Sequence, residues 1–329
     1  MRNKKLVDYA KYGYLFSLPF ILTFCIFTLY PVIYTFVIGF TDLKGAGNTE
    51  IHMLPFISPK DGSPFYIFNN FKDVLTSKTF HKAFTNTWII WFLNFFPQMG
   101  FALLFTAWFT DRRSKVKGTG LFKVLFYMPN IITAATMAIL FQKLFGFPVG
   151  AINQLFNAAK PYNFLINNWP VKFIIAFVQF FQWYGHTMVN LIAGVIGISP
   201  EIFEAAEIDG ANRVQTFFKV TIPCIRQIML FVLVTSLIGG LNMFDIPQLL
   251  TSGRPDNATR TLSMYIYDTA FKRPYKYNRA AASSIVLFIV VVICSAILFF
   301  LMRDKDAAKM EKLKKQEIKR RKLEEKGAL

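Results

Sequence analysis

Residues 197–223 read GISPEIFEAAEIDGANRVQTFFKVTIP and lie between two apolar runs. Ser199 is suited to the N-cap of a helix, and Pro200 to its first turn. Glu201 follows where the helix dipole favours a negative charge. Gly210 can adopt the left-handed conformation that commonly ends a helix. These residues predict a short helix that stops at the glycine.

A second short helix is predicted after this glycine. It covers residues 213–220, and Pro223 closes the unit because proline interrupts helical hydrogen bonding. Two short helices joined at an angle form a compact unit. A passive linker would not need such definition, so we expect residues 199–223 to have a function of their own.

Apolar runs dominate the rest of the chain, which is 54% hydrophobic and only 17% charged over 329 residues. Soluble domains carry about 25% charged residues. This composition excludes a disordered chain, a disulfide scaffold and an ordinary soluble enzyme. A membrane helix needs about 20 apolar residues. Six stretches without Lys, Arg, Asp or Glu are close to that length: 12–41, 83–110, 124–142, 173–200, 227–244 and 280–302. The predicted fold class is an all-α membrane protein with six transmembrane helices.

The distribution of basic residues predicts the orientation of these helices. With the N-terminus inside, 23 of the 37 Lys and Arg residues fall on cytoplasmic segments, as the positive-inside rule requires. Both termini are therefore expected in the cytoplasm. The first run is too long for a signal-peptide core and lacks an A-x-A site, so we expect it to remain as a span. The formal net charge of +18 does not indicate nucleic-acid binding, because the charges are confined to segments between apolar runs.

The chain is thus divided into a cytoplasmic N-terminus (1–11), a six-span domain (12–302) and a basic cytoplasmic tail (303–329). Two shorter elements are expected outside the spans. Residues 144–159 predict a short interfacial or loop helix. Residues 70–75 predict a short amphipathic helix at the outer surface, with Phe71 and Leu75 on one face.

No metal or nucleotide site is predicted in this chain. Cys25, Cys224 and Cys294 lack ligand spacing and are expected to be buried small hydrophobes. His52 and His81 are not close in sequence, which argues against a metal site. The phosphate-binding pattern G-x-x-x-x-G-K-[ST] is absent. Energy for any transport must therefore come from elsewhere.

The fourth run carries the densest polar set of any span. Trp183, His186 and Asn190 share one helical face, and Gln179 lies one turn earlier beside Gln182. Polar groups facing lipid are costly, so this face is expected to line the bundle interior or a watery path. An aromatic ring beside amides suits a sugar. Hydrogen bonds that only hold the helices together are an equally good interpretation.

The fifth run adds a second polar set, which includes Ser236, Asn242 and the pair Gly239-Gly240. The two glycines permit either a roomy path or a close contact between helices. Asp245 follows near the expected outer interface, two residues before Pro247. We interpret it as an interfacial or helix-end carboxylate.

The quoted loop resembles the EAA loop of binding-protein-dependent import permeases. The family pattern is E-A-A, three residues, G, nine residues, then I-x-L-P. Glu204-Ala205-Ala206, Gly210 and Val220-Thr221-Ile222-Pro223 keep every spacing, with Val220 for Ile and Ile222 for Leu. Further segments resemble the sugar-importing branch of the maltose or glycerol-phosphate type: Leu18-Pro19, Tyr30-Pro31-Val32-Ile33, Asn70-Phe71 and residues 250–255, LTSGRP.

The resemblance implies a type I ABC importer permease fold and an inner-membrane location in a bacterial cell. It implies partners: a second homologous permease, two cytoplasmic ATPase subunits that bind ATP and Mg, and an outer substrate-binding protein. The chain itself would then need no cofactor and would not be an enzyme. The residues implied in ATPase coupling are Glu204, Ala205, Ala206, Asp209, Gly210 and Pro223.

The resemblance also implies which positions contact sugar: Trp183, His186, Ser236, Gly240 and Met243. Gly240 and Met243 stand where polar side chains are expected for maltose, which favours a roomier path or another glycan. No span interior has Lys or Arg, so a neutral sugar is favoured over glycerol phosphate or another polyol derivative. Two rivals from other classes are an ion-coupled carrier acting alone and a membrane-embedded enzyme.

Overall fold

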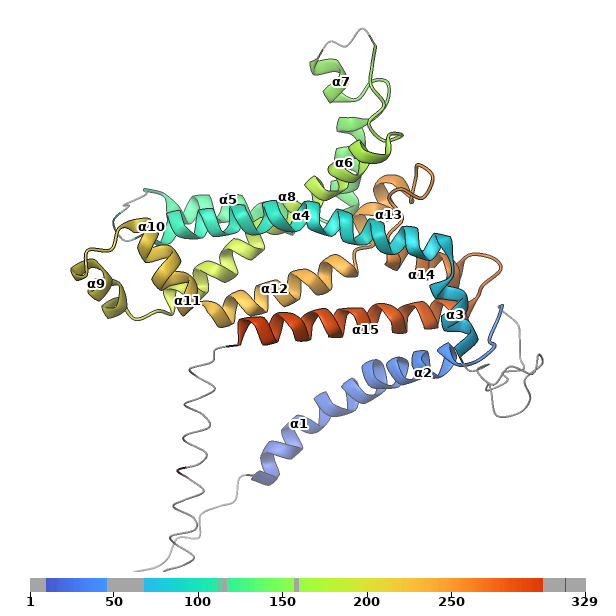
Figure 1. The fold of residues 1–329 in the computed structure, drawn as a ribbon, viewed down its shortest axis with the longest axis horizontal. Helices are drawn as coiled ribbons and strands as arrows, with labels where there is room; N and C mark the ends of the chain where they lie inside the picture. The colour runs from blue at the N-terminus through green and yellow to red at the C-terminus, as the bar shows by residue number, and fades with distance from the viewer. Residues whose placement is uncertain are drawn as a thin grey trace, which may run out of the picture. The chain divides into compact units, whose positions relative to one another are not determined.

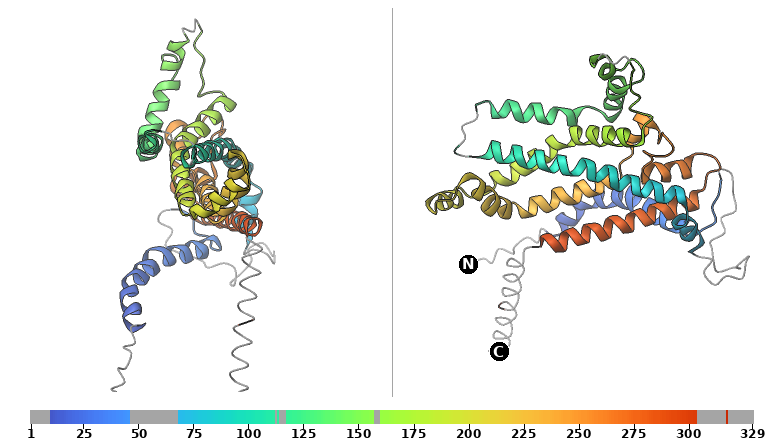
Figure 2. Two further views of the ribbon diagram at one scale, coloured as in Figure 1. Left: turned by 90° about the vertical axis from the view of Figure 1, so that its left-hand side faces the viewer. Right: turned by 45° about the horizontal axis from the view of Figure 1, so that its top comes forward.

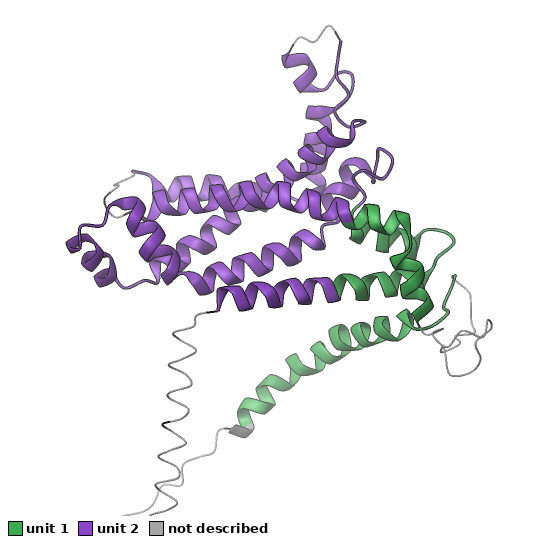
Figure 3. Ribbon diagram, in the orientation of Figure 1, with its two compact units in different colours: residues 1–84, 261–288 green, residues 85–260, 289–329 purple. Residues whose placement is uncertain are grey.

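A computed structural model describes residues 10–45, 68–111, 113, 117–156, 160–303 and 317 (Figure 1). Every regular element in these residues is helical, as the sequence predicts. The chain folds into two compact units, of residues 1–84 with 261–288 and of residues 85–260 with 289–329 (Figure 3). Of the expected N-terminus (1–11) and basic tail (303–329), residues 1–9 and 304–329 lie outside the described residues, apart from residue 317.

Unit 1 contains the first predicted span. Its elements are α1 (Ala10–Phe24), a π-helical turn (Cys25–Leu29), α2 (Tyr30–Gly39), α3 (Asn69–Leu75), the start of α4, α14 (Leu262–Phe271) and the first half of α15 (Tyr277–Met302).

Unit 2 contains most of α4 (Lys78–Thr110) and the end of α15. Between them follow α5 (Thr119–Ile131), α6 (Ala134–Phe145), α7 (Ala151–Leu155), α8 (Asn168–Ile196), α9 (Pro200–Ile208), α10 (Arg213–Thr216), a π-helical turn (Phe217–Thr221), α11 (Ile222–Cys224), α12 (Arg226–Leu241) and α13 (Asp245–Thr251). The short α7 lies within the segment where the sequence predicts a loop helix.

Four helical segments of the described chain are long and apolar enough to cross a membrane: Tyr12–Gly39, Lys78–Thr110, Arg226–Thr251 and Tyr277–Met302. The bent pair α5–α6 makes up to five. With 29 residues, α8 is also long enough, but its Gln, Asn and His side chains lower its hydropathy. The chain is therefore an all-α protein with several membrane-scale helices.

The third predicted span is not one straight helix, because α5 and α6 meet at 91°. Ile132 and Thr133 adopt extended backbone conformations at the break, and the Thr133 hydroxyl accepts a hydrogen bond from the Thr136 amide to start α6. Pro129 lies one turn before the break. A residue that caps a new helix within an apolar run has the effect of ending the old one.

Both π-helical turns of the described chain precede a proline by two residues. The Tyr30 amide bonds to the Cys25 carbonyl before Pro31, and the Ile222 amide bonds to the Phe217 carbonyl before Pro223. A proline ring clashes with the carbonyl one turn earlier in a regular α-helix, and a widened turn relieves this clash. After the π-helical turn at Phe217–Thr221, α11 ends at Cys224, one residue beyond Pro223, where the sequence predicts the unit to close.

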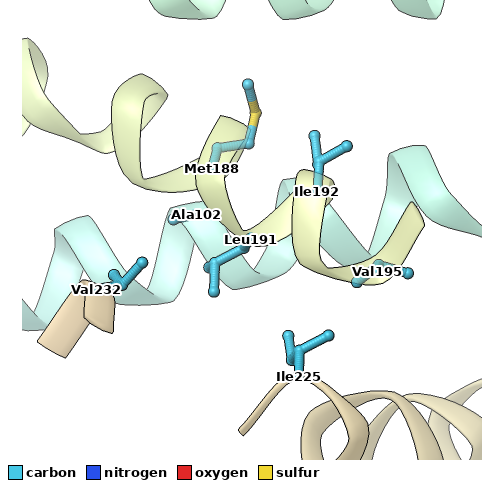
Figure 4. Close-up of a cluster of buried hydrophobic side chains, with 7 residues drawn as sticks. All are labelled: Ala102, Met188, Leu191, Ile192, Val195, Ile225 and Val232. Atoms are coloured by element: carbon cyan, nitrogen blue, oxygen red, sulfur yellow. The ribbon is translucent and has the colours of Figure 1, made fainter. Parts of the chain in front are cut away.

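The core of unit 2 joins α4, α8 and the start of α12. In Figure 4 the buried cluster consists of Ala102, Met188, Leu191, Ile192, Val195, Ile225 and Val232. The ribbons of these three helices run beside one another in Figure 1 and in both views of Figure 2. Gly185 brings α8 against α5, since a Cβ at this position would overlap the Phe126 carbonyl.

In unit 1, the Asn70 side chain joins three helices. Its amide nitrogen donates to the carbonyls of Gly39 (2.9 Å) and Thr41 (2.8 Å), and its oxygen accepts from the Asn278 amide nitrogen (2.9 Å). The predicted helix at residues 70–75 forms as α3, and the face that carries Phe71 and Leu75 is its less buried one. Asn70 and Val74 are buried, whereas Leu75 is exposed, because the helix turns its hydrogen-bonding side inward.

The cysteines also differ from expectation. Cys25 and Cys224 are exposed and Cys294 is half-buried. In a chain surrounded by lipid, apolar and weakly polar side chains do not need protein burial, which is why burial rules from soluble proteins fail here.

Candidate functional site

The polar face of α8 lines a cavity of about 280 Å³ in unit 2. Side chains of α4, α8, α12 and the start of α13 form most of its walls. It contains all nine residues expected along the substrate path: Gln179, Gln182, Trp183, His186, Asn190, Ser236, Gly240, Asn242 and Met243. The fold therefore gathers two sequence segments, one on each side of the loop at residues 197–223, around a single cavity.

Trp183, His186 and Asn190 form the aromatic and polar side of this cavity. The rings of Trp183 and His186 meet edge to face with centroids 5.8 Å apart. The Asn190 amide nitrogen lies 3.4 Å from the His186 Nδ1 atom, at the long end of the hydrogen-bonding range. Trp183 remains 43% exposed. An open indole face beside polar groups can stack on an apolar ligand surface while the neighbours bond to hydroxyls.

Gln182 has a structural role at the cavity wall. Its side-chain nitrogen donates to the Ile132 carbonyl (3.0 Å), and its backbone carbonyl accepts from the Asn130 side chain (3.3 Å). The first bond satisfies the Ile132 carbonyl where α5 ends, and both bonds hold the α5–α6 bend against α8. Of the two interpretations left open by the sequence, hydrogen bonding between helices describes Gln182.

The two glycines of α12 have different surroundings. A Cβ on Gly240 would overlap the indole of Trp91, whose Nε1–H donates to the Ser236 carbonyl (3.1 Å). Gly239 has no atom within 4 Å of an added Cβ. Gly240 therefore permits a close contact with α4, and Gly239 leaves the cavity open. Met243 is buried at its wall, whereas the Asn242 side chain bonds back to the Ile238 carbonyl (2.8 Å).

The sequence interpretation missed the contribution of α4. Asp245, interpreted as an interfacial or helix-end carboxylate, is the first residue of α13 and also lines the cavity. Asn94 and Gln98 line the cavity, together with Thr187 and Asp245. The Gln98 side-chain nitrogen donates to the Thr187 hydroxyl (2.8 Å). The buried side-chain oxygen of Asn94, Oδ1, has no hydrogen-bond partner in the described part of the chain. The spacing of four between Asn94 and Gln98, which places both on one helical face, was the available signal.

At the other end of α8 and α12, the quoted loop forms a sharply bent elbow, residues 199–223. The Gly210 amide bonds to the Glu207 carbonyl (3.1 Å) and the Ala211 amide to the Ala206 carbonyl (3.0 Å). With Gly210 at φ +75°, this is the Schellman arrangement that ends a helix. Ser199 occupies the predicted N-cap position of α9, although its side chain makes no capping hydrogen bond.

A capping box starts the second arm of the elbow. Asn212 and Gln215 exchange side-chain to backbone hydrogen bonds of 2.9 Å each. Such reciprocal bonds satisfy two free amides at a helix start. The turn at Gly210 is thus held on both sides.

Most residues expected in ATPase coupling are exposed on the elbow: Glu204, Ala205, Asp209, Gly210 and Pro223. Ala206 is buried instead. The tip also presents Ile208, which is 87% exposed and which the sequence interpretation did not select.

Residues 83–304 match the family of the binding-protein-dependent transport system inner membrane component. The chain is 28% identical to the lactose transport system permease protein LacF of Rhizobium radiobacter, over 82% of this chain and 86% of that protein. It is also 28% identical to the arabinooligosaccharides transport system permease protein AraP of Bacillus subtilis, over 77% of each chain.

A solved structure has the same fold. It is a bacterial alginate ABC transporter in complex with alginate pentasaccharide-bound periplasmic protein, and the match has a TM-score of 0.69 at 22% identity. The alignment covers 90% of this chain and 94% of that one. The family match, which includes the elbow, the polar face of α8 and the cavity, shows that the chain belongs to the binding-protein-dependent transport system inner membrane components.

Proposed function

We propose that this chain is the transmembrane permease subunit of an ATP-driven importer of a neutral sugar or oligosaccharide in the bacterial cytoplasmic membrane. The observation that carries this proposal is the cavity, whose polar and aromatic lining lies within a unit built from apolar helices. Polar surface at membrane depth is costly unless it faces protein or a watery path. The names of the lactose and arabinooligosaccharide relatives support a carbohydrate as the solute.

The cavity chemistry favours an uncharged glycan. Its lining includes amides, hydroxyls and two aromatic rings but no Lys or Arg. A glycerol phosphate would need such a cation to offset its charge. We therefore assign Gln179, Trp183, His186, Asn190 and Ser236 to the path, with Gln182, Gly240, Asn242 and Met243 shaping its wall.

We place six spans in the membrane, with the elbow in the cytoplasm: α1–α2, α4, α5–α6, α8, α12 and α15. Two contacts support this arrangement. The Arg226 guanidinium donates to the Leu301 carbonyl (3.2 Å), and the Arg113 guanidinium contacts Glu207 on the elbow. Three segments with the basic bias of cytoplasmic loops thereby meet at one end of unit 2. Because the span number is even, both termini would be cytoplasmic.

The elbow would be the docking point of the ATPase. We infer that Glu204, Ala205, Asp209, Gly210 and Pro223 present or shape this contact, and that Ala206 permits its tight fold. ATP and Mg would be bound by two cytoplasmic ATPase subunits, and this chain would hold no cofactor. A second homologous permease and an outer substrate-binding protein would complete the assembly. The family membership supports this machine over an ion-coupled carrier acting alone.

The test is transport by the assembled complex in proteoliposomes. We expect uptake of neutral oligosaccharide to require ATP and the binding protein. Gly210→Pro should abolish both uptake and substrate-stimulated ATPase, because proline fixes φ near −65° where the elbow has +75°. Gly210→Asn is the matched control, since asparagine tolerates the left-handed region. Intact coupling in Gly210→Pro would contradict the proposal, as would uptake by the isolated chain without ATP.

A further inference from the structure

The end of α4 holds the elbow at three points. Arg113 Nε lies 2.6 Å from a Glu207 carboxylate oxygen, and an Arg113 terminal nitrogen donates to the Ala211 carbonyl (3.2 Å). Asp111, directly after α4, lies 3.3 Å from Arg213 Nε. The three contacted residues lie before, in and after the turn at Gly210. We call Asp111 and Arg113, with Glu207 and Arg213, the elbow clamp.

The clamp is also joined internally. The Asp111 carboxylate accepts a hydrogen bond from the Arg113 amide (3.0 Å) while its other oxygen faces Arg213. A guanidinium that bonds one carboxylate and one carbonyl fixes direction better than a single ion pair does. Each pair taken alone is exposed and contributes little to folding stability. The clamp therefore matters for the position of the elbow relative to the end of α4 and not for folding stability.

Apolar packing does not replace the clamp between α4 and the second arm of the elbow. A cavity of about 570 Å³ separates them, with Leu104 and Trp108 of α4 on one side and Val214 and Phe217 on the other. On the first arm, Phe203 packs partly against the core of unit 2. The second arm is thus connected to the end of α4 by polar contacts across a hollow.

The same helix reaches the substrate cavity. Asn94 and Gln98 line that cavity, Ala102 lies in the core with α8, and Asp111 follows the last turn. A helix is a stiff element, so a displacement at its end reaches residues several turns away.

We propose that the elbow clamp is a positioning device that transmits the movement of the elbow to α4, and so to the substrate cavity. This inference rests on the proposed function, because it assumes that an ATPase moves the elbow. Arg113 and Glu207 are positioning residues here, and they need not touch ATPase or sugar.

Charge exchange tests the clamp in the assembled transporter. Arg113→Glu and Glu207→Arg each place like charges together and should lower the sugar molecules imported per ATP hydrolysed by about threefold or more. The double exchange restores opposite charges and should recover the ratio to within about twofold of the parent. The ATPase should co-purify with all three variants. Lys272→Glu, which reverses the exposed cation of the ion pair with Asp268 at the end of α14, is the matched control.

The outcomes separate the two proposals. If Gly210→Pro blocks coupling but neither single exchange changes the ratio, the clamp is wrong and the elbow function stands. If the single variants import fewer sugar molecules per ATP and the double variant does not recover the ratio, the clamp proposal is also overturned. If Gly210→Pro has no effect either, the proposed function itself fails.

A second measurement does not depend on charge. In a chain with Cys25, Cys224 and Cys294 replaced by alanine, cysteines at positions 113 and 207 can be joined by a short bifunctional thiol reagent. The unjoined chain lacks the Arg113–Glu207 ion pair and should have reduced uptake. Because the clamp moves as one piece in this proposal, joining the two cysteines should restore uptake to within about twofold of the cysteine-free parent. Loss of uptake on joining would show that the two sides must separate, which would overturn the proposal.

Discussion

Trp183 offers the clearest single-residue test of the cavity. Its indole is 43% exposed among amides, and a sugar that stacks on it would bury that surface. We expect Trp183→Ala to reduce sugar affinity of the complex by about tenfold, equal to about 1.4 kcal/mol of binding free energy. Equilibrium binding of radiolabelled sugar measures this. Trp169→Ala, at an exposed indole near the start of α8, is the control, and an equal loss there would contradict the assignment.

We expect Asp245 to influence the charge of the sugar that the cavity accepts. It is the one carboxylate of the lining, which has no Lys or Arg. An acidic sugar would be repelled, because like charges in a partly enclosed site interact strongly. We expect Asp245→Asn to raise the affinity for an acidic oligosaccharide by about threefold or more relative to a neutral one of equal length. An unchanged ratio in competition binding would contradict this role, and Asp256→Asn, outside the cavity, serves as control.

At the residue scale, the sequence predicted those site residues that share one face of a single helix. The i, i+3, i+7 set on α8 led to Trp183, His186 and Asn190 because one helix determines which of its residues share a face. The spacing of Asn94 and Gln98 also places both on one face of α4, but the sequence does not show that this face meets the cavity, because that depends on how α4 packs against α8. The place of Asp245 depends in the same way on the packing of α13. Ala206 is buried in the elbow, and its part in a partner contact stays a prediction.

At the scale of the element, the neighbouring glycines of α12 provide a matched pair. Gly240→Ala forces the buried Trp91 indole away from α12, and such overpacking costs about 1–3 kcal/mol of unfolding free energy. Gly239→Ala meets no atom within 4 Å. We expect only the Gly240 variant to lower the thermal denaturation midpoint of the detergent-purified complex, by several degrees. Equal denaturation midpoints of the Gly239 and Gly240 variants would contradict the close packing of Gly240 against Trp91 of α4.

The α5–α6 bend marks the limit of element prediction. Residues 124–142 are uncharged and mostly apolar, and the break at Ile132–Thr133 contains neither glycine nor proline, although Pro129 lies one turn before it. The Ile132 carbonyl at the break accepts a hydrogen bond from the Gln182 side chain of α8, and the Asn130 side chain of α5 donates to the Gln182 carbonyl. A pattern of apolar residues predicts that a segment is helical. It does not predict where the helix breaks when a neighbouring helix supplies hydrogen bonds to the free backbone groups. The elbow, in contrast, carries its own stops and caps in its sequence, and its two arms were predicted.

At the scale of the whole molecule, the position of the elbow is open to direct measurement. If six spans cross the membrane, Ile208 faces the cytoplasm and Val149, on the connection between α6 and α7, faces outward; both are highly exposed. In a chain without native cysteines, Val149→Cys should react with a membrane-impermeant thiol reagent in intact cells. Ile208→Cys should react only after the cells are opened, and binding of the ATPase should protect it. Reaction of Ile208→Cys in intact cells would place the elbow outside, where no ATP-driven motor could reach it.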